Sequence, residues 1–152
     1  MKKFLLLGII ALIGSAALAQ SSKAVKWTFT SKKLSAGTYE VRMSAAISGD
    51  YHMYAQDAGV EGPMPTAITF TKNPLVTVEG AKAKESGKMV KKFESAWSGT
   101  VNYYEKTVDF IQVVKVKGKA KTNLAGKVEF MVCNDEQCLP PSEVEFSVNI
   151  GG

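Results

Sequence analysis

Apolar and polar residues alternate along much of the chain. In residues 143–150 every second side chain is apolar, namely Val144, Phe146, Val148 and Ile150. Residues 127–132 show the same alternation. A period of two places successive side chains on opposite faces of a β-strand, with one face buried and the other in contact with water. We therefore predict two strands here and expect them to pair as a hairpin.

The same alternation predicts further strands upstream, and helical periodicity is almost absent. The predicted strands cover residues 25–30, 39–43, 51–55, 67–71, 76–79 and 108–116. Turn-forming pairs such as Gly49-Asp50 and Asn73-Pro74 separate them. This pattern predicts an all-β fold, an immunoglobulin-like β-sandwich with the cysteine pair at one end of the final hairpin; a β-barrel is the alternative. The lysine-rich residues 82–92 are the most polar stretch, and we expect a mobile connection there.

The first residues have the composition of a secretory signal. Met1-Lys2-Lys3 precedes an apolar run, and Ala17-Leu18-Ala19 ends it. A basic start, a short apolar segment and small residues at its end are typical of a cleavable signal peptide. We expect a signal peptide over residues 1–19, cleavage near Ala19-Gln20, a periplasmic or secreted location, and a single domain over residues 20–152.

The charge distribution does not favour a nucleic-acid partner. Lysine and arginine number 19 and aspartate and glutamate 14, which gives a formal net charge of +5. The lysines are spread along the chain without the arginine and aromatic clusters typical of nucleic-acid binding. His52 is the one histidine of the sequence, and no recognisable serine nucleophile motif accompanies it, so a hydrolase is poorly supported.

Both cysteines of the chain, Cys133 and Cys138, lie in the segment FMVCNDEQCLPPSEVEF between the two strands of the final hairpin. An exported protein meets oxidising conditions, so the pair can form one intramolecular bridge. One interpretation is a permanent staple. In the chain-entropy model, however, closing so short a loop contributes roughly 2 kcal/mol, below the ~3 kcal/mol of a 15-residue loop.

A metal clip and a redox couple are the other interpretations of this pair. Zinc or copper requires three or four suitable ligands, and the chain offers two thiols, His52 and scattered methionines. A redox couple requires an accessible thiolate and a second thiol that resolves the mixed disulfide. The polar residues 134–137 place the pair near the surface, and Pro140-Pro141 stiffens the exit from Cys138. These residues leave both the staple and the redox couple open.

Residues 133–141 hold two cysteines followed by a diproline, and this segment resembles the N-terminal periplasmic domain of the thiol:disulfide interchange protein DsbD. Similar segments occur in matching order at residues 50–54, 62–66 and 104–110. The resemblance implies an immunoglobulin-like sandwich with a redox-active disulfide. It also implies that such a domain takes electrons from a thioredoxin-like donor and passes them to exported client proteins.

The resemblance implies roles for individual residues. Cys138 would enter the mixed disulfide with the client, and Cys133 would resolve it. Family members shield the pair with a cap loop, which corresponds here to residues 98–104, including Tyr104, with Tyr103 as the expected shield; ordinary strand packing of these tyrosines is the alternative. His52 and Tyr54 fall where the family places aromatic side chains beside the cysteines, and a histidine there can stabilise a thiolate or carry its proton.

Two features differ from the better-known relatives. They have one more residue between the cysteines, often with an aromatic before the second, where this chain has Gln137. We also expect this protein to lack the transmembrane electron-transfer domain and the thioredoxin-like domain of those relatives, since neither occurs within residues 1–152. We therefore expect a stand-alone thiol-disulfide oxidoreductase of the protein-disulfide reductase type, which receives electrons from a separate protein and contacts the membrane only through that protein.

We expect no metal or organic cofactor, because the disulfide itself would carry the electrons. The competing hypothesis is a secreted immunoglobulin-like binding module whose disulfide is a local staple. Solvent access of the two sulfur atoms distinguishes the two hypotheses.

Overall fold

The computed structural model describes residues 23–152, so the predicted signal peptide at residues 1–19 lies outside the described residues. The elements are β1 (Val25–Ser35), β2 (Thr38–Ile47), β3 (His52–Tyr54), β4 (Ala67–Phe70), β5 (Val76–Val78), β6 (Lys84–Glu94), the short 3-10 helix η1 (Ser95–Trp97), β7 (Gly99–Val116), β8 (Lys121–Phe130), β9 (Val132–Cys133) and β10 (Ser142–Gly151). No helix in this part of the chain has the length and apolar character that crossing a membrane requires.

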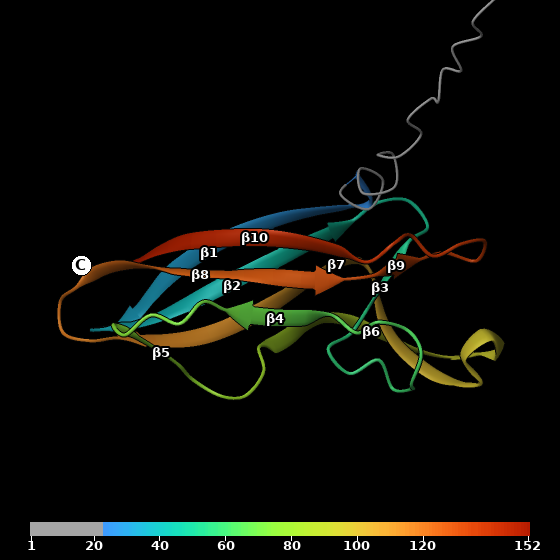
Figure 1. Cartoon of the computed structure of the whole chain (residues 1–152), viewed down its shortest axis with the longest axis horizontal. Coiled ribbons are helices and arrows are strands. Elements are labelled where there is room, and N and C mark those ends of the chain that lie inside the picture. Colours follow the sequence, from blue (N-terminus) through green and yellow to red (C-terminus); the bar gives the residue numbers. More distant parts are fainter. Residues whose placement is uncertain (1–22) are drawn as a thin grey trace, which may run out of the picture.

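The strands form two antiparallel sheets. The larger sheet has the order β1-β2-β7-β3-β9, and β5 and β6 also pair with β7; the smaller sheet has the order β10-β8-β4. Figure 1 shows the two sheets lying one over the other along the long axis of the domain. This arrangement confirms the predicted all-β, immunoglobulin-like sandwich.

The alternation along the strands builds the core between the sheets. In β2 the side chains of Val41 and Met43 are buried, and in β8 those of Leu124 and Val128 are buried, while their neighbours in sequence are at least partly exposed. These residues belong to one hydrophobic cluster that also contains Phe110 of β7. Complete burial of an apolar side chain of this size stabilises a fold by roughly 1.5–3 kcal/mol.

The final hairpin is confirmed and is longer than predicted. Strands β8 and β10 pair from Phe130 and Ser142 at one end to Lys121 and Gly151 at the other. The connection between them carries β9 and both cysteines. The hairpin therefore presents the cysteine segment at one end of the sandwich.

The expectation of a mobile connection at residues 82–92 is wrong. Most of these residues form β6, which pairs with β7 along its length except for a register shift between Gly87 and Met89. Strand β6 lies at a sheet edge and buries little of either face, so its side chains do not alternate between apolar and polar. Lysines on an exposed edge strand also discourage pairing with another chain.

Strand β7 begins nine residues earlier than predicted, at Gly99 rather than at residue 108. Lys106 adopts a positive φ of 64° within the exposed segment 105–107, which interrupts the alternation that a sequence pattern relies on. The first part of β7 pairs with the end of β6, and η1 joins the two strands. This projecting hairpin lies at the same end of the molecule as the cysteine segment (Figure 1).

Candidate functional site

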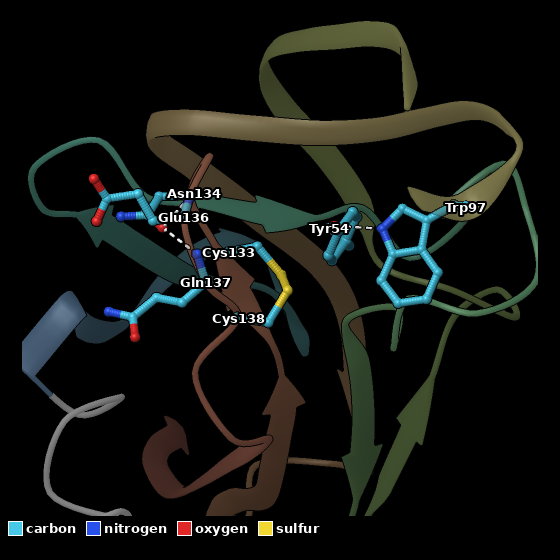
Figure 2. Close-up of a disulfide and its surroundings, with 7 residues drawn as sticks. All are labelled: Tyr54, Trp97, Cys133, Asn134, Glu136, Gln137 and Cys138. Atoms are coloured by element: carbon cyan, nitrogen blue, oxygen red, sulfur yellow. Dashed lines mark hydrogen bonds between the residues drawn. A yellow bond between two sulfur atoms is a disulfide. The ribbon is translucent and has the colours of Figure 1, made fainter. Parts of the chain in front are cut away.

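A short turn joins the two cysteines. Cys133 and Cys138 form a disulfide, and their Cα atoms, 4.0 Å apart, are partners in an antiparallel bridge. The Asn134 Oδ1 atom accepts hydrogen bonds from the backbone N–H groups of Glu136 and Gln137, at 3.1 and 2.8 Å. The Asn134 N–H donates to the Gln137 carbonyl at 2.9 Å. Because an asparagine side chain that bonds its own backbone fixes a turn, Asn134 holds the loop in the form seen in Figure 2.

Three further hydrogen bonds tie this loop to the domain. The Asn134 amide donates to Asp50 at 3.2 Å, and the Gln137 amide donates to the Tyr51 hydroxyl at 3.3 Å. Beyond the disulfide, the N–H of Leu139 donates to the carbonyl at the start of β9 at 2.9 Å, and its side chain joins the main core. The loop is therefore anchored at both ends while residues 135–137 remain exposed.

The two cysteines differ in exposure. The exposed fraction of Cys133 is 2%, and it packs in a hydrophobic cluster. Cys138 is an exposed residue. A molecule that arrives from solution therefore meets Cys138 before Cys133.

Strand register gathers the site side chains on one face of the larger sheet. His52 of β3 lies opposite Cys133 of β9, and Tyr54 of β3 lies opposite Tyr103 of β7. Because side chains alternate between faces along a strand, these four residues share one face. The intervening residues Met53, Tyr104 and Val132 all belong to the main core on the other face.

A second hydrophobic cluster surrounds the buried cysteine. Its buried members are Tyr54, Ala58, Val101, Tyr103 and Cys133, and Val60, Val90, Trp97 and Met131 pack against it. The exposed fraction of Tyr103 is 4%, so this side chain is an internal neighbour of Cys133. Tyr104 points to the opposite face, where its hydroxyl donates to Glu85 at 2.9 Å, and burial together with this hydrogen bond raises the pKa of the phenol.

Trp97 is a site residue that the sequence reasoning missed. It ends η1 at the tip of the β6–β7 hairpin, and its indole Nε1–H donates to the Tyr54 hydroxyl at 3.2 Å. In Figure 2 the Tyr54 ring lies between the disulfide and the indole. The sequence did offer one signal for this role. Trp97 is a large aromatic residue among the mostly polar residues 94–100, one position before the expected cap loop.

The loop before β4 supports this tryptophan. Gly62 lies against the indole so closely that a Cβ atom built there would stand 2.4 Å from Trp97 Cε3. A few residues later, the Thr66 hydroxyl donates to the Tyr54 carbonyl at 2.6 Å. The segment at residues 62–66 therefore holds two aromatic neighbours of the disulfide in position.

His52 lies between two of the tyrosines. Its ring centroid is 4.3 Å from that of Tyr103 and 5.4 Å from that of Tyr54, with the Tyr54 ring perpendicular to it. Burial lowers the pKa of the imidazole, although the carboxylates of Glu94 and Glu105 act in the opposite direction. Its neutral form is therefore favoured near neutral pH.

The described residues contain no group of three or more histidine, cysteine, aspartate or glutamate side chains that could hold a metal ion.

Comparison with known proteins identifies the family. The family model "Thiol:disulfide interchange protein DsbD, N-terminal" matches residues 16–150. The chain belongs to the DsbD N-terminal domain family. This membership confirms the resemblance drawn from the cysteine segment and its three companion segments, and it places the chain among thiol:disulfide interchange domains.

A search of solved structures also found similar chains. The N-terminal periplasmic domain of ScsB from Proteus mirabilis aligns with a TM-score of 0.56 and 16% identity, covering 86% of this chain and 47% of that chain. The chain thus spans about half the length of that structure. The DsbD N-terminal domain of Neisseria meningitidis in the reduced form aligns with a TM-score of 0.48 and 18% identity, covering 86% and 89% of the two chains. No curated protein matches the sequence.

Within this fold, five of the six expected site residues come together. Cys133, His52, Tyr54 and Tyr103 share a face, and Cys138 joins them through the disulfide. Tyr104 follows Tyr103 in sequence but faces the main core instead.

Proposed function

We propose that this domain relays reducing equivalents from a thioredoxin-like donor to disulfides of exported proteins, using Cys133 and Cys138 as its redox pair. The observation that carries the proposal is the unequal exposure of the two cysteines, 2% for Cys133 and an exposed position for Cys138, in a member of a thiol:disulfide interchange family. A cysteine at an exposed position can meet a partner disulfide, and a buried neighbour is protected from other reactants.

The exchange proceeds through two displacements. In the reduced domain, the Cys138 thiolate attacks one sulfur of the client disulfide, and the other client sulfur leaves as a thiolate and takes a proton. The Cys133 thiolate then attacks the Cys138 sulfur, which forms the intramolecular disulfide and expels the second client thiolate. The client gains two electrons and two protons. A dithiol donor of thioredoxin type restores the domain by the reverse steps.

In this proposal the aromatic side chains shield the inner sulfur between encounters. Tyr103 packs with Cys133 inside the second cluster, and Trp97 covers Tyr54 from the hairpin tip. Because η1 buries none of its residues, we expect its tip to move more readily than the core strands when a partner arrives.

The location and partners follow from the same proposal. The matching segment of ScsB is described as periplasmic, and an exported address agrees with the signal-like composition of residues 1–19. We place the domain in the periplasm, where a separate electron-transfer protein at the membrane supplies its donor. The redox-active disulfide needs no further cofactor in this scheme.

Trapping with glutathione disulfide tests the assigned cysteine roles. Cys133→Ser leaves the exposed thiol without a resolving partner, so the mixed disulfide between Cys138 and glutathione should accumulate. Cys138→Ser leaves only the buried thiol, and we expect about tenfold slower adduct formation. Mass spectrometry of the intact proteins after a time course measures both adducts.

Equal rates of adduct formation by the two variants would contradict the assigned roles. Absence of any adduct in both variants, with the folded state verified by circular dichroism, would contradict the exchange function itself. That result would favour a binding module in which the disulfide is a local staple.

A further inference from the structure

The exchange steps described above use the two cysteines, and His52, a polar residue of the same site, has no role in them. Among the side-chain nitrogen and oxygen atoms of the described residues, only His52 Nε2 and Trp27 Nε1 are buried without a hydrogen-bond partner. An indole N–H can only donate, whereas an imidazole nitrogen can also accept. Leaving a buried polar atom unpaired costs about 1–3 kcal/mol. An unpaired nitrogen beside a reactive centre therefore suggests a partner present at another stage of the cycle.

The position of Cys133 fits such a partner. His52 and Cys133 lie directly opposite each other across β3 and β9, and side chains so placed have Cβ atoms roughly 5 Å apart. In the disulfide the Cys133 sulfur carries no proton. After reduction it carries an S–H group, which can donate to a neutral imidazole nitrogen.

The buried thiol needs an internal proton acceptor before it can attack. Only the thiolate is a competent nucleophile, and with an exposed fraction of 2% Cys133 has little access to bases dissolved in water. Its neighbours Tyr54 and Tyr103 cannot take up the proton, because phenols are already protonated at neutral pH and burial raises the pKa of both further. His52 is the neighbour whose neutral form has a free acceptor.

We propose that His52 Nε2 accepts the Cys133 proton in the step that releases the client, an inference that rests on the proposed function. The S–H bond breaks as the N–H bond forms, and the thiolate then attacks the Cys138 sulfur. The new Cys133–Cys138 bond forms while the bond from Cys138 to the client breaks. The client sulfur leaves with the electron pair and takes the proton back from the imidazolium through water. The client is reduced, and the cysteine pair is oxidised.

The surroundings keep the imidazole neutral at the pH where it must accept a proton. Burial has the largest effect and lowers the pKa of His52, and Lys92 of β6 lowers it further. The carboxylates that oppose this shift are Glu94 of β6, Glu105 of β7 and Asp135 of the disulfide loop. The other titratable neighbours are Tyr54 of β3 and Tyr103 of β7, whose rings contact the imidazole, and Cys133 of β9 once the disulfide is reduced.

Reaction of the reduced protein with 5,5′-dithiobis(2-nitrobenzoate) separates the two displacements. The first release of the coloured thiolate reports attack by Cys138 and depends on reagent concentration. The second release reports attack by Cys133 on the mixed disulfide, and its rate is independent of reagent concentration. We expect His52→Gln, which keeps a polar group but cannot take up the proton, to slow the second phase at least about tenfold and to change the first less than about twofold.

The pH dependence provides a readout that a purely structural role would not change. Since the pKa of His52 is lowered, its base form persists below the ordinary value of about 6.5. The second-phase rate of the unaltered protein should therefore be level near neutral pH and fall only as the pH drops through this lowered pKa. In His52→Gln the rate should instead keep rising with pH as the thiol itself ionises. His52→Phe, which keeps a flat ring against Tyr103, should behave as His52→Gln does.

Three outcomes would overturn the inference. Equal second phases in the unaltered protein and in either folded variant would remove His52 from the proton transfer while leaving the proposed exchange function in place. A second-phase rate that keeps rising through neutral pH in the unaltered protein would do the same, even if both variants failed to fold. Absence of any second phase in the unaltered protein would contradict the exchange function and, with it, this role of His52.

Discussion

Single side chains around Cys133 differ in what they contribute. Tyr103 fills the cluster from inside and is almost inaccessible, whereas Trp97 is only partly buried and sits on the exposed hairpin tip. Burial raises the pKa of Tyr54 more than the hydrogen bond from Trp97 lowers it. The contact between Trp97 and Tyr54 is therefore that of a neutral donor and a neutral acceptor, worth about 1 kcal/mol, which is weak enough to break when a partner docks.

Removal of the Trp97 side chain should expose the reduced pair. We expect Trp97→Ala to speed alkylation of the reduced cysteines by iodoacetamide about fivefold, because the cover over Tyr54 is lost. The rate is measured by mass spectrometry at a fixed pH.

Phe93→Ala is the matched control for this change, because Phe93 lies on the same hairpin with an exposed fraction of 66% and covers little. Its alkylation rate should equal that of the unaltered protein. A Trp97→Ala rate no faster than that of this control would remove the tryptophan from the shield.

At the scale of elements, the site depends on segments that support one another. The β6–β7 hairpin carries Trp97, the loop before β4 supports it, and the β8–β10 connection presents the disulfide. Gly62 adopts a positive φ of 125° and lies against the indole, so its lack of a side chain serves both the backbone conformation and the packing.

Gly62→Ala should move the indole and open the site. The added Cβ would stand 2.4 Å from Trp97 Cε3, and we expect a loss of about 2–3 kcal/mol in the free energy of unfolding, from backbone strain together with this contact. Alkylation of the reduced cysteines should accelerate as in Trp97→Ala. Urea unfolding and iodoacetamide labelling measure the two effects.

Gly118→Ala separates the backbone effect from the contact. Gly118 has a φ of 63° but nothing lies within 4 Å of a Cβ built there, so we expect a loss of about 1 kcal/mol and no change in alkylation. Identical behaviour of the two alanine variants would contradict a supporting role for the segment at residues 62–66.

The strands that the sequence predicts well are those with one buried face. The hairpin of β8 and β10 and the core strands β2 and β7 alternate clearly, since each contacts the opposite sheet. Strand β6 was missed because it lies at an edge and packs against neither core with a regular period. The start of β7 was missed because the exposed segment around Lys106 breaks the alternation.

The site could be predicted where chemistry is visible in the residues themselves. The cysteine pair, the polar turn and His52 stand out in any reading of the sequence. The position of Trp97 depends on its contact with Gly62, which lies far from it in sequence, and on the pairing of β6 with β7. No local sequence pattern reveals either of them. Only the register of β7 against β3 shows that Tyr103 and Tyr104 point to opposite faces of the sheet.

At the scale of the whole molecule, the sandwich presents the disulfide and its aromatic neighbours at one end. The main core lies between the sheets, and the second cluster lies on the other face of the larger sheet around Cys133. Since the disulfide closes only a short loop, it contributes little to the stability of this core, roughly 2 kcal/mol in the chain-entropy model. Reduction of the bridge should leave the fold intact, as a working redox pair requires.

The reduction potential of the Cys133–Cys138 bridge tests the central claim most directly. The purified domain is equilibrated in a series of glutathione or dithiothreitol buffers, and free thiols are counted at each potential. A working redox pair predicts a value near thioredoxin-like couples, roughly −200 to −270 mV. A value below about −300 mV would mark a structural staple and contradict the proposed exchange function.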